Sequence, residues 1–188
     1  MASYLWAIPL LPLLGAILNG YGALSGRLSR GAVHVIACAV VLLSFLVSCA
    51  AFVSLVNMGG HGGEGHEAVP QLVSRAFTWI QAGSFKVDAA LLVDPLSSVM
   101  ILVITGIGFL IHLYSTGYMN HEESYARYFA YLNLFTFSML ILVMGENMLM
   151  MFVGWEGVGV CSYLLIGFWF REVKNSEAGM KAFVVNRV

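Results

Sequence analysis

The stretch "FVGWEGVGVCSYLLIGFW", residues 152–169, places a single carboxylate, Glu156, in an otherwise uncharged and mostly apolar run. A helix needs roughly 20 residues to cross a hydrocarbon core about 30 Å thick, and this run is nearly that long. The whole chain has the same character, because 60% of its 188 residues are hydrophobic and only 10% are charged. A soluble domain of this length needs far more polar surface. The sequence therefore predicts an integral membrane protein.

The few charged residues divide the chain into long apolar segments. These segments predict an all-α polytopic bundle with five transmembrane helices, near residues 4–24, 33–57, 95–118, 127–145 and 148–170.

A sixth helix is expected to start at Asn175–Ser176, with Glu177 in its first turn. By Val188 it would have risen only about 20 Å, which is too short to cross a bilayer. We therefore expect residues 1–188 to form a single membrane domain that is the front part of a longer protein.

The longest loop, residues 58–94, has two parts. The first, "MGGHGGEGHE", is rich in glycine, so a solvated loop is favoured over a metal site built from its histidine and glutamate side chains, His61, Glu64, His66 and Glu67. The second part has short apolar pieces on both sides of Ala82–Gly83–Ser84, which predicts a small β-hairpin on the outer surface.

Lys and Arg residues predict the orientation. Two lie in the loops that follow spans 2 and 4, Arg75 and Lys86, and five lie in the loops that follow spans 1, 3 and 5, Arg27, Arg30, Arg127, Arg171 and Lys174. The positive-inside rule then predicts an outer N-terminus, with the hairpin on the same side.

Composition excludes several functions. A formal net charge of −1 provides no basic surface for nucleic acid. Cys38, Cys49 and Cys161 lie in apolar segments without paired spacing, so we expect small buried side chains rather than disulfides or metal ligands. No Cys framework or nucleotide-binding glycine motif is present, and we expect no cofactor or redox centre in this chain.

Glu156 is the strongest candidate for chemistry. It lies eight residues into its predicted span, about 12 Å along the helix, too deep for snorkelling or capping. An acid at this depth costs roughly 3 kcal/mol on insertion scales and persists where it is paired, hydrated or functional. Two interpretations stay open: a proton carrier, or a neutral glutamic acid that hydrogen-bonds across helices for packing.

Four further residues could belong to a proton path. Arg187 lies deep in the predicted sixth helix, about 17 Å from its start, and Lys181 lies one or two turns in, where snorkelling is the alternative. Both would give Glu156 basic neighbours. His112, late in the third span, is either a relay group or a neutral histidine that bonds across helices. Asp94 precedes Pro95, which is typical of a helix N-cap, so a role in proton uptake is secondary.

Several segments resemble one known family. The stretches "TGIGFLIHLYSTGYM", "RYFAYLNLF", "GWEGVGVCSYLLIGFW" and "MKAFVVNRV" are similar to the L subunit of proton-pumping NADH–quinone oxidoreductase, respiratory complex I. The resemblance covers most of residues 85–188 and implies a helical bundle with inverted repeats. It also implies a proton channel in which Glu156 is the essential acid, with Lys181 and Arg187 at conserved basic positions. Asp94 and His112 fall on conserved positions as well.

The resemblance implies a proton-translocating subunit of a translocase, while NADH oxidation and quinone reduction take place elsewhere in the complex. Its expected partners are the lipid bilayer and other membrane subunits of complex I, and its expected location is the bacterial inner membrane. The family's partner lysine for Glu156 and its broken helices would lie beyond Val188. Two alternatives stay open: a large subunit of a multisubunit cation/proton antiporter, and a truncated structural fragment without transport of its own.

Overall fold

A computed structural model describes residues 3–59 and 69–187 of the chain. Its elements, in chain order, are a 3-10 helix η1 (Ser3–Trp6), α1 (Ala7–Ser25), α2 (Arg30–Gly59), β1 (Leu72–Ala82), β2 (Phe85–Val93), α3 (Pro95–Tyr118), α4 (Tyr125–Met144), α5 (Met148–Ile166) and α6 (Val173–Val185). Within these residues, five helices are long and apolar enough to cross a membrane. The predicted fold class, a polytopic helical bundle with a small hairpin, is confirmed.

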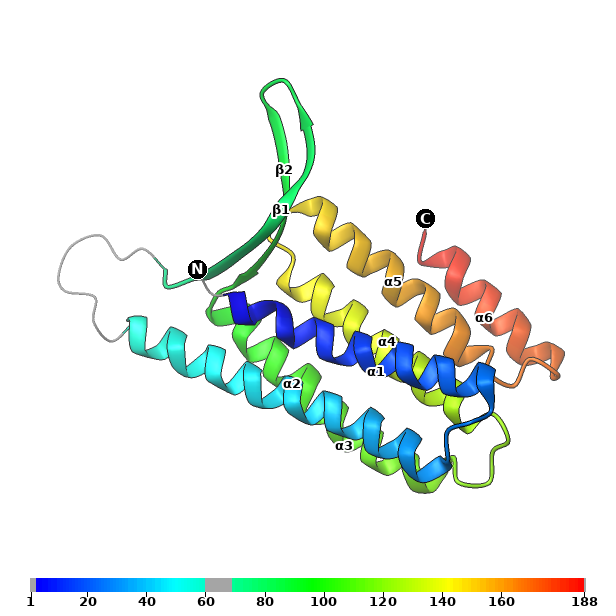
Figure 1. Ribbon diagram of the computed structural model, residues 1–188. Helices are drawn as coiled ribbons and strands as arrows, with labels where there is room; N and C mark the ends of the chain where they lie inside the picture. The colour runs from blue at the N-terminus through cyan, green and yellow to red at the C-terminus, as the bar shows by residue number, and fades with distance from the viewer. Residues whose placement is uncertain (1–2, 60–68, 188) are drawn as a thin grey trace.

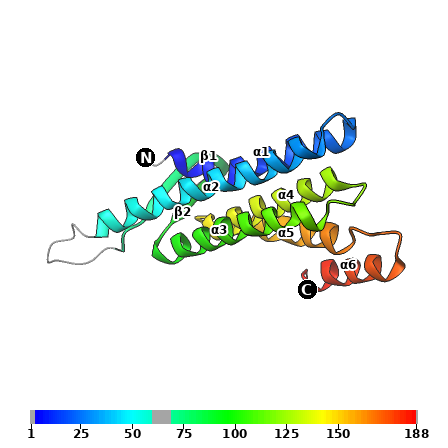
Figure 2. The ribbon, with the colours of Figure 1, turned by 90° about the horizontal axis from the view of Figure 1, so that it is seen from below.

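The long helices lie side by side, and α4 occupies the centre of the bundle (Figures 1 and 2). It contacts α1, α2, α3 and α5, whereas α6 packs against α5 at the edge of the bundle. Because lipid tails are as apolar as the side chains, small residues that let backbones approach contribute much of the packing between such helices. Gly15 is one of these, since a Cβ there would lie 3.2 Å from the Asn133 side chain of α4.

The β-hairpin projects from one end of the bundle (Figure 1). Its strands are antiparallel, with Ala82 paired to Phe85 across a turn in which Gly83 has a positive φ of 61°. The base of β2 is buried, including Ala90 and Leu91, while the outer part of the hairpin is exposed. The predicted hairpin and its turn are therefore confirmed.

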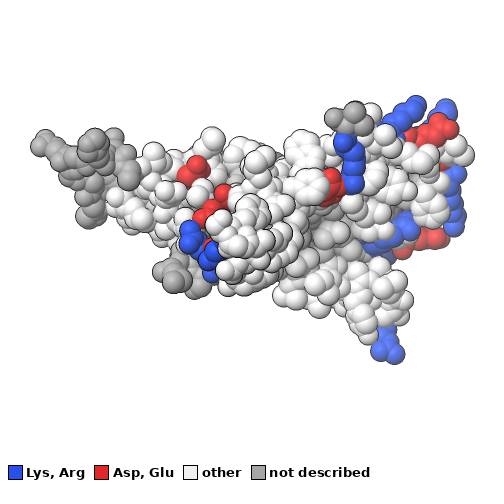
Figure 3. Space-filling view, turned by 90° about the horizontal axis from the view of Figure 1, so that it is seen from above, with Lys and Arg blue, Asp and Glu red and all other residues white. Residues whose placement is uncertain are grey.

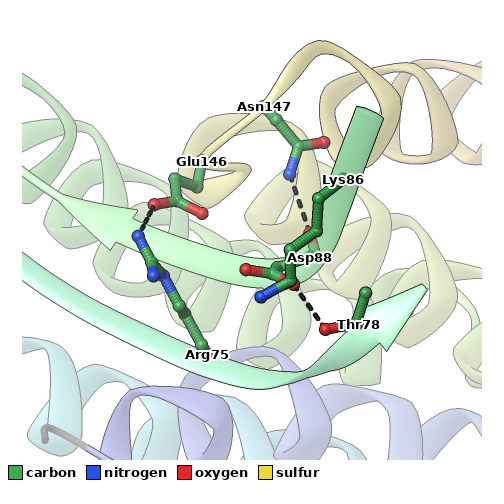
Figure 4. A network of polar contacts seen from close by, with 6 residues as sticks. All are labelled: Arg75, Thr78, Lys86, Asp88, Glu146 and Asn147. Carbon is green, nitrogen blue, oxygen red and sulfur yellow. Dashed lines mark hydrogen bonds and ion pairs between the residues drawn. The ribbon is translucent and has the colours of Figure 1, made fainter. Parts of the chain in front are cut away.

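Figure 4 shows how the hairpin is attached to the turn between α4 and α5. The amide of Asn147 donates to the backbone oxygen of Asp88 at 2.8 Å, and Arg75 forms an ion pair with Glu146 at 3.5 Å. Thr78 donates to the Asp88 carboxylate at 2.8 Å, and this bond is the main reason that the pKa of Asp88 is lowered. These contacts fix the hairpin to the helical bundle.

The start of the sixth helix differs from the prediction. Its N-cap is Glu172, and the backbone NH groups of Asn175 and Ser176 donate to the Glu172 carbonyl at 3.0 and 3.3 Å. Asn175 and Ser176 therefore lie inside the first turn, and Glu177 follows in the next one. The physical reason is that the Ser176 hydroxyl donates back to the carbonyl of Phe170 at 3.1 Å instead of capping the helix.

The two ends of the bundle carry different loops. The described N-terminal residues, the hairpin and the α4–α5 turn lie at one end, and the α1–α2, α3–α4 and α5–α6 loops lie at the other (Figures 1 and 2). Charged side chains gather toward the ends of the face drawn in Figure 3. The assignment of one end to the outside stays a prediction. The Gly-rich stretch with His61, Glu64, His66 and Glu67 lies outside the described residues.

Candidate functional site

An ion pair joins Glu156 of α5 to Arg187, just beyond the last residue of α6. The guanidinium nitrogen Nη2 of Arg187 lies 2.5 Å from Oε2 of Glu156. The two side chains are 28% and 34% exposed in the isolated chain, so most of each is covered by protein. The pair brings a candidate acid and a candidate base from the sequence into direct contact.

Local sequence explains why Glu156 lies between two helices. Asn147 starts α5 by accepting the NH of Met150 at 3.0 Å, which sets Glu156 in the third turn. Gly157 faces α4, where a Cβ would lie 2.6 Å from the Ser138 hydroxyl oxygen. Gly159 faces the other way, where a Cβ would lie 2.8 Å from the Asn186 amide. Glycine therefore permits the close approach of a helix on each side of Glu156.

Aromatic side chains hold the end of α6 against α5. The indole NH of Trp155 donates to the Asn186 carbonyl at 3.3 Å. The Arg187 guanidinium lies 4.0 Å from the centre of the Phe183 ring, a cation–π contact, and Phe183 in turn contacts the ring of Tyr163. These contacts place the Arg187 side chain beside Glu156.

The chemistry of the pair follows from its two members. Arginine stays protonated in proteins, so Arg187 can only donate, and Glu156 accepts as a carboxylate. An adjacent cation favours the charged acid, whereas burial favours the protonated acid. A pocket of about 300 Å³ between α4 and α5, lined in part by Ser138 and Cys161, reaches the same carboxylate.

Lys181 does not join this site. Its side chain is exposed, and none of the hydrogen bonds or ion pairs found among residues 3–59 and 69–187 involves it. Of the two candidate bases on α6, the structure brings only Arg187 to Glu156.

Asp94 lies at the start of α3 and acts as its N-cap. Its carboxylate accepts the backbone NH of Ser97 at 2.7 Å, and Ser97 donates its hydroxyl to the same oxygen at 2.7 Å. These two bonds, the hydroxyl bond first, lower the pKa of Asp94. With Pro95 as the first helical residue, the geometry is a capping box. The capping interpretation of Asp94 accounts for all of these contacts.

His112 is buried in the centre of the bundle, on a different side of α4 from Glu156. Its side chain is 1% exposed, and its Nδ1 lies 2.7 Å from the carbonyl oxygen of Gly108. The ring also contacts Phe129 of α4. The five predicted proton-path residues thus fall in separate places, and only Glu156 and Arg187 touch one another. Their shared role stays a prediction.

Two buried amides were not among the sequence candidates. Asn19 of α1 and Asn133 of α4 are both completely buried. The signal that could have found them is the same one that singles out Glu156: each is a polar residue inside an apolar run, "AILNGYG" and "YLNLF". Amides are neutral, so the pattern of charges does not mark them.

Comparisons with known proteins agree with this architecture. A family model for the N-terminus of chain 5 of NADH-ubiquinone oxidoreductase, complex I, matches residues 79–129. A second model, for the transmembrane region of NADH:quinone oxidoreductase and Mrp antiporters, matches residues 145–188. The second match includes the Glu156–Arg187 pair.

Curated relatives match nearly the whole chain. NADH-quinone oxidoreductase subunit L of Mycobacterium tuberculosis is 45% identical over 98% of this chain and 28% of its own length. Subunit L of Escherichia coli is 44% identical over 95% of this chain and 27% of its own length. The chloroplastic NAD(P)H-quinone oxidoreductase subunit 5 of Mesostigma viride is 40% identical over 100% of this chain and 28% of its own length. The chain therefore spans little more than a quarter of the length of these relatives, and it belongs to the family of subunit L, or chain 5, of NADH-quinone oxidoreductase.

Proposed function

We propose that this chain is part of a proton-translocating membrane subunit of an NADH-quinone oxidoreductase, and that Glu156 is a proton carrier in its path. The observation that carries the proposal is the ion pair between Glu156, within the membrane-spanning helix α5, and Arg187, just beyond the end of α6. An ionisable group within a membrane span is rare and marks ion or proton pathways. The similarity to subunits named NADH-quinone oxidoreductase subunit L supports the same function.

The arrangement supports a carrier whose proton affinity changes with the position of α6. The guanidinium of Arg187 lies 2.5 Å from the Glu156 carboxylate, so a movement of α6 would change the charge beside the acid. Within the described residues α6 packs against α5, so a shift of α6 would act on the contact between Arg187 and Glu156.

The proposal includes the molecular setting. Residues 1–188 act as one membrane domain, with residues 58–94 as its external loop, in the bacterial inner membrane. Its partners are the other membrane subunits of complex I, and NADH oxidation and quinone reduction take place in other subunits. His112 is a secondary member of the path, Asp94 serves as the cap of α3, and Lys181 contributes only if α6 turns.

A second candidate is a large subunit of a multisubunit cation/proton antiporter. The observation that favours it is that the model matched by residues 145–188 also describes Mrp antiporters. The two candidates differ in coupling: a complex I subunit pumps only during quinone reduction, whereas an antiporter exchanges cations for protons without electron transfer. Cation-dependent proton release from vesicles, measured without NADH, separates them.

The experiment on Glu156 uses the full-length subunit in assembled complex within vesicles. Glu156→Gln keeps the size and hydrogen bonding of the side chain but cannot release a proton, so we expect intact assembly and impaired proton uptake per electron pair. Glu156→Asp keeps the acid and should retain part of the pumping. If Glu156 only packs between helices, Glu156→Gln should pump normally because Gln is an isosteric neutral residue. Glu156→Asp should then be the impaired variant, because the shorter side chain disturbs the helix contacts. Normal pumping by the assembled Gln variant would contradict the carrier role.

A further inference from the structure

Three fully buried polar side chains lie on α4 and on two helices that contact it, α1 and α3, away from the Glu156 site. Asn19 of α1 and Asn133 of α4 are 0% exposed, and His112 of α3 is 1% exposed. Both polar atoms of each amide, and Nε2 of His112, have no hydrogen-bond partner among the described residues. Buried polar atoms in native proteins are almost always paired, so five such atoms in one region require an explanation.

Asn133, on the central helix α4, is close to both of the other helices. It is near enough to the His112 ring to affect it, yet neither Nε2 of His112 nor the Asn133 amide has a hydrogen-bond partner among the described residues. On its other side, Asn133 faces α1, where a Cβ at Gly15 would lie 3.2 Å from its amide nitrogen. Asn19 is four residues after Gly15, one helical turn along the same face of α1. A Cβ at Gly15 would also lie 2.5 Å from Cγ2 of Val40, so glycine allows α1 to approach both α2 and α4 here.

The hydrogen bond at Nδ1 fixes the chemistry of His112. A backbone carbonyl only accepts, so Nδ1, 2.7 Å from the Gly108 oxygen, must carry a proton. In the neutral ring, Nε2 is then an acceptor without a hydrogen. The region therefore holds one imidazole acceptor together with two amides, each of which can donate and accept. Such a mixed set is suited to a molecule that both donates and accepts.

We propose that Asn19, His112 and Asn133 form a buried water-binding site, in which a small cluster of ordered water molecules bridges the two amides and Nε2 of His112. A buried water typically needs two to four polar partners, and these five atoms supply them. The assignment goes beyond the proposed function and does not depend on proton transfer by Glu156, which lies on the other side of α4.

The site also has a polar connection toward the end of the bundle that carries most of the basic residues. Ser115 lies one turn beyond His112 on α3, is 2% exposed, and its hydroxyl lies 3.2 Å from that of Tyr128. The two hydroxyls extend the polar lining from the amides toward the α3–α4 loop. Water in the site would thus lie next to a row of groups that can exchange hydrogen bonds with it.

Hydroxyl-radical footprinting with short X-ray pulses tests the proposal, because bound water is radiolysed in place and oxidises the side chains that it touches. The sample is the assembled complex that contains the full-length subunit. We expect rapid oxidation of His112. The internal control is Met144, which is equally buried in an apolar cluster and is chemically more reactive, and we expect it to stay protected. Protection of His112 to the same degree as Met144 would overturn the proposal.

Variants sharpen the measurement. Asn133→Leu removes a polar side chain from the site, so oxidation of His112 should fall severalfold. Asn133→Ser keeps a hydroxyl there and should retain much of the His112 oxidation. Glu156→Gln should leave the His112 signal unchanged, which keeps this test separate from that of the proposed function. Unchanged oxidation of His112 in an assembled Asn133→Leu variant would also contradict the site. If that variant does not assemble, the comparison of His112 with Met144 in the unaltered protein still decides.

Discussion

The guanidinium of Arg187 lies 2.5 Å from the carboxylate of Glu156, across the interface between α6 and α5. The same end of α6 is held by the Trp155 indole through the carbonyl of Asn186. A displacement of α6 would therefore separate a fixed positive charge from an acid in the apolar part of the bundle. The pair therefore ties the position of the end of α6 to the charge beside Glu156.

This link predicts strong coupling between the two residues. Removal of one partner leaves an unpaired charge in an apolar environment, whereas removal of both leaves none. We expect Glu156→Gln and Arg187→Gln each to lower the thermal stability of the subunit. The double variant should lose less stability than the sum of the two single losses, with an interaction energy of about 0.5–3 kcal/mol. Lys181→Gln, on the same helix, is the matched control, and its effect on stability should be additive with that of Glu156→Gln. Additive effects of Glu156→Gln and Arg187→Gln would show that the pair does not form in the assembled subunit.

Gly154 predicts a steric limit on the α4–α5 interface. A Cβ at this position would overlap the backbone of Leu142, which cannot move without shifting α4. We expect Gly154→Ala to destabilise the subunit by about 1–3 kcal/mol, the usual range for overpacking. Gly117→Ala in α3 is the control, because a Cβ there meets no atom within 4 Å. Thermal unfolding in detergent measures both, and equal midpoints for the two variants would contradict the tight α4–α5 packing.

The sequence predicted the fold because a bilayer imposes simple rules. A long apolar run must be a helix in lipid, so the five spans could be placed to within a few residues. The turn at Gly83 was visible because glycine readily adopts a positive φ. The start of α6 was misplaced because Asn175 and Ser176 are typical capping residues, and only the folded loop shows that Ser176 bonds to the Phe170 carbonyl instead.

The candidate site was only partly predictable. The burial of a charge in an apolar run marked Glu156 and Arg187 directly. Which base reaches the acid depends on the rotation of α6 about its axis and on the close approach at Gly159, and neither is encoded in spacing alone. The pattern of charges does not mark Asn19 and Asn133, because both are neutral amides inside apolar runs.

Asn147 has two separate bonds that a pair of variants can distinguish. Its side-chain oxygen caps α5 through the NH of Met150, and its amide nitrogen holds the hairpin through the Asp88 carbonyl. Asn147→Ser keeps a capping oxygen but cannot reach the hairpin in the same way, whereas Asn147→Ala removes both bonds. We expect hydrogen exchange of the hairpin to rise in both variants and that of the first turn of α5 to rise only with Ala. Unchanged hydrogen exchange in the hairpin of both variants would show that the other contacts alone fix the hairpin to the bundle.

The orientation of the bundle is predicted by its basic residues. We expect Ser84→Cys at the hairpin turn to react with a membrane-impermeant thiol reagent from the outer side, and Ser29→Cys in the α1–α2 loop to react only from the inner side. The background lacks the three native cysteines, Cys38, Cys49 and Cys161. Both positions lie in turns at opposite ends of the bundle, so labelling of both from one side would reject the topology.

Asp94 is predicted to contribute as a helix cap rather than as a proton carrier. Its pKa is lowered by the Ser97 bonds, so its contribution to stability is full above the ordinary pKa of about 3.9 and is lost as pH falls through the lower folded value. Asp94→Ala should lower the free energy of unfolding by about 1 kcal/mol. Asn caps a helix nearly as well as Asp, so Asp94→Asn should change the stability little and should remove the part of it that depends on pH. The decisive measurement is proton pumping by assembled complex with Asp94→Asn. Near-normal pumping supports the cap, because an amide cannot carry a proton. A large loss of pumping with unchanged thermal stability would instead place Asp94 in the proton path.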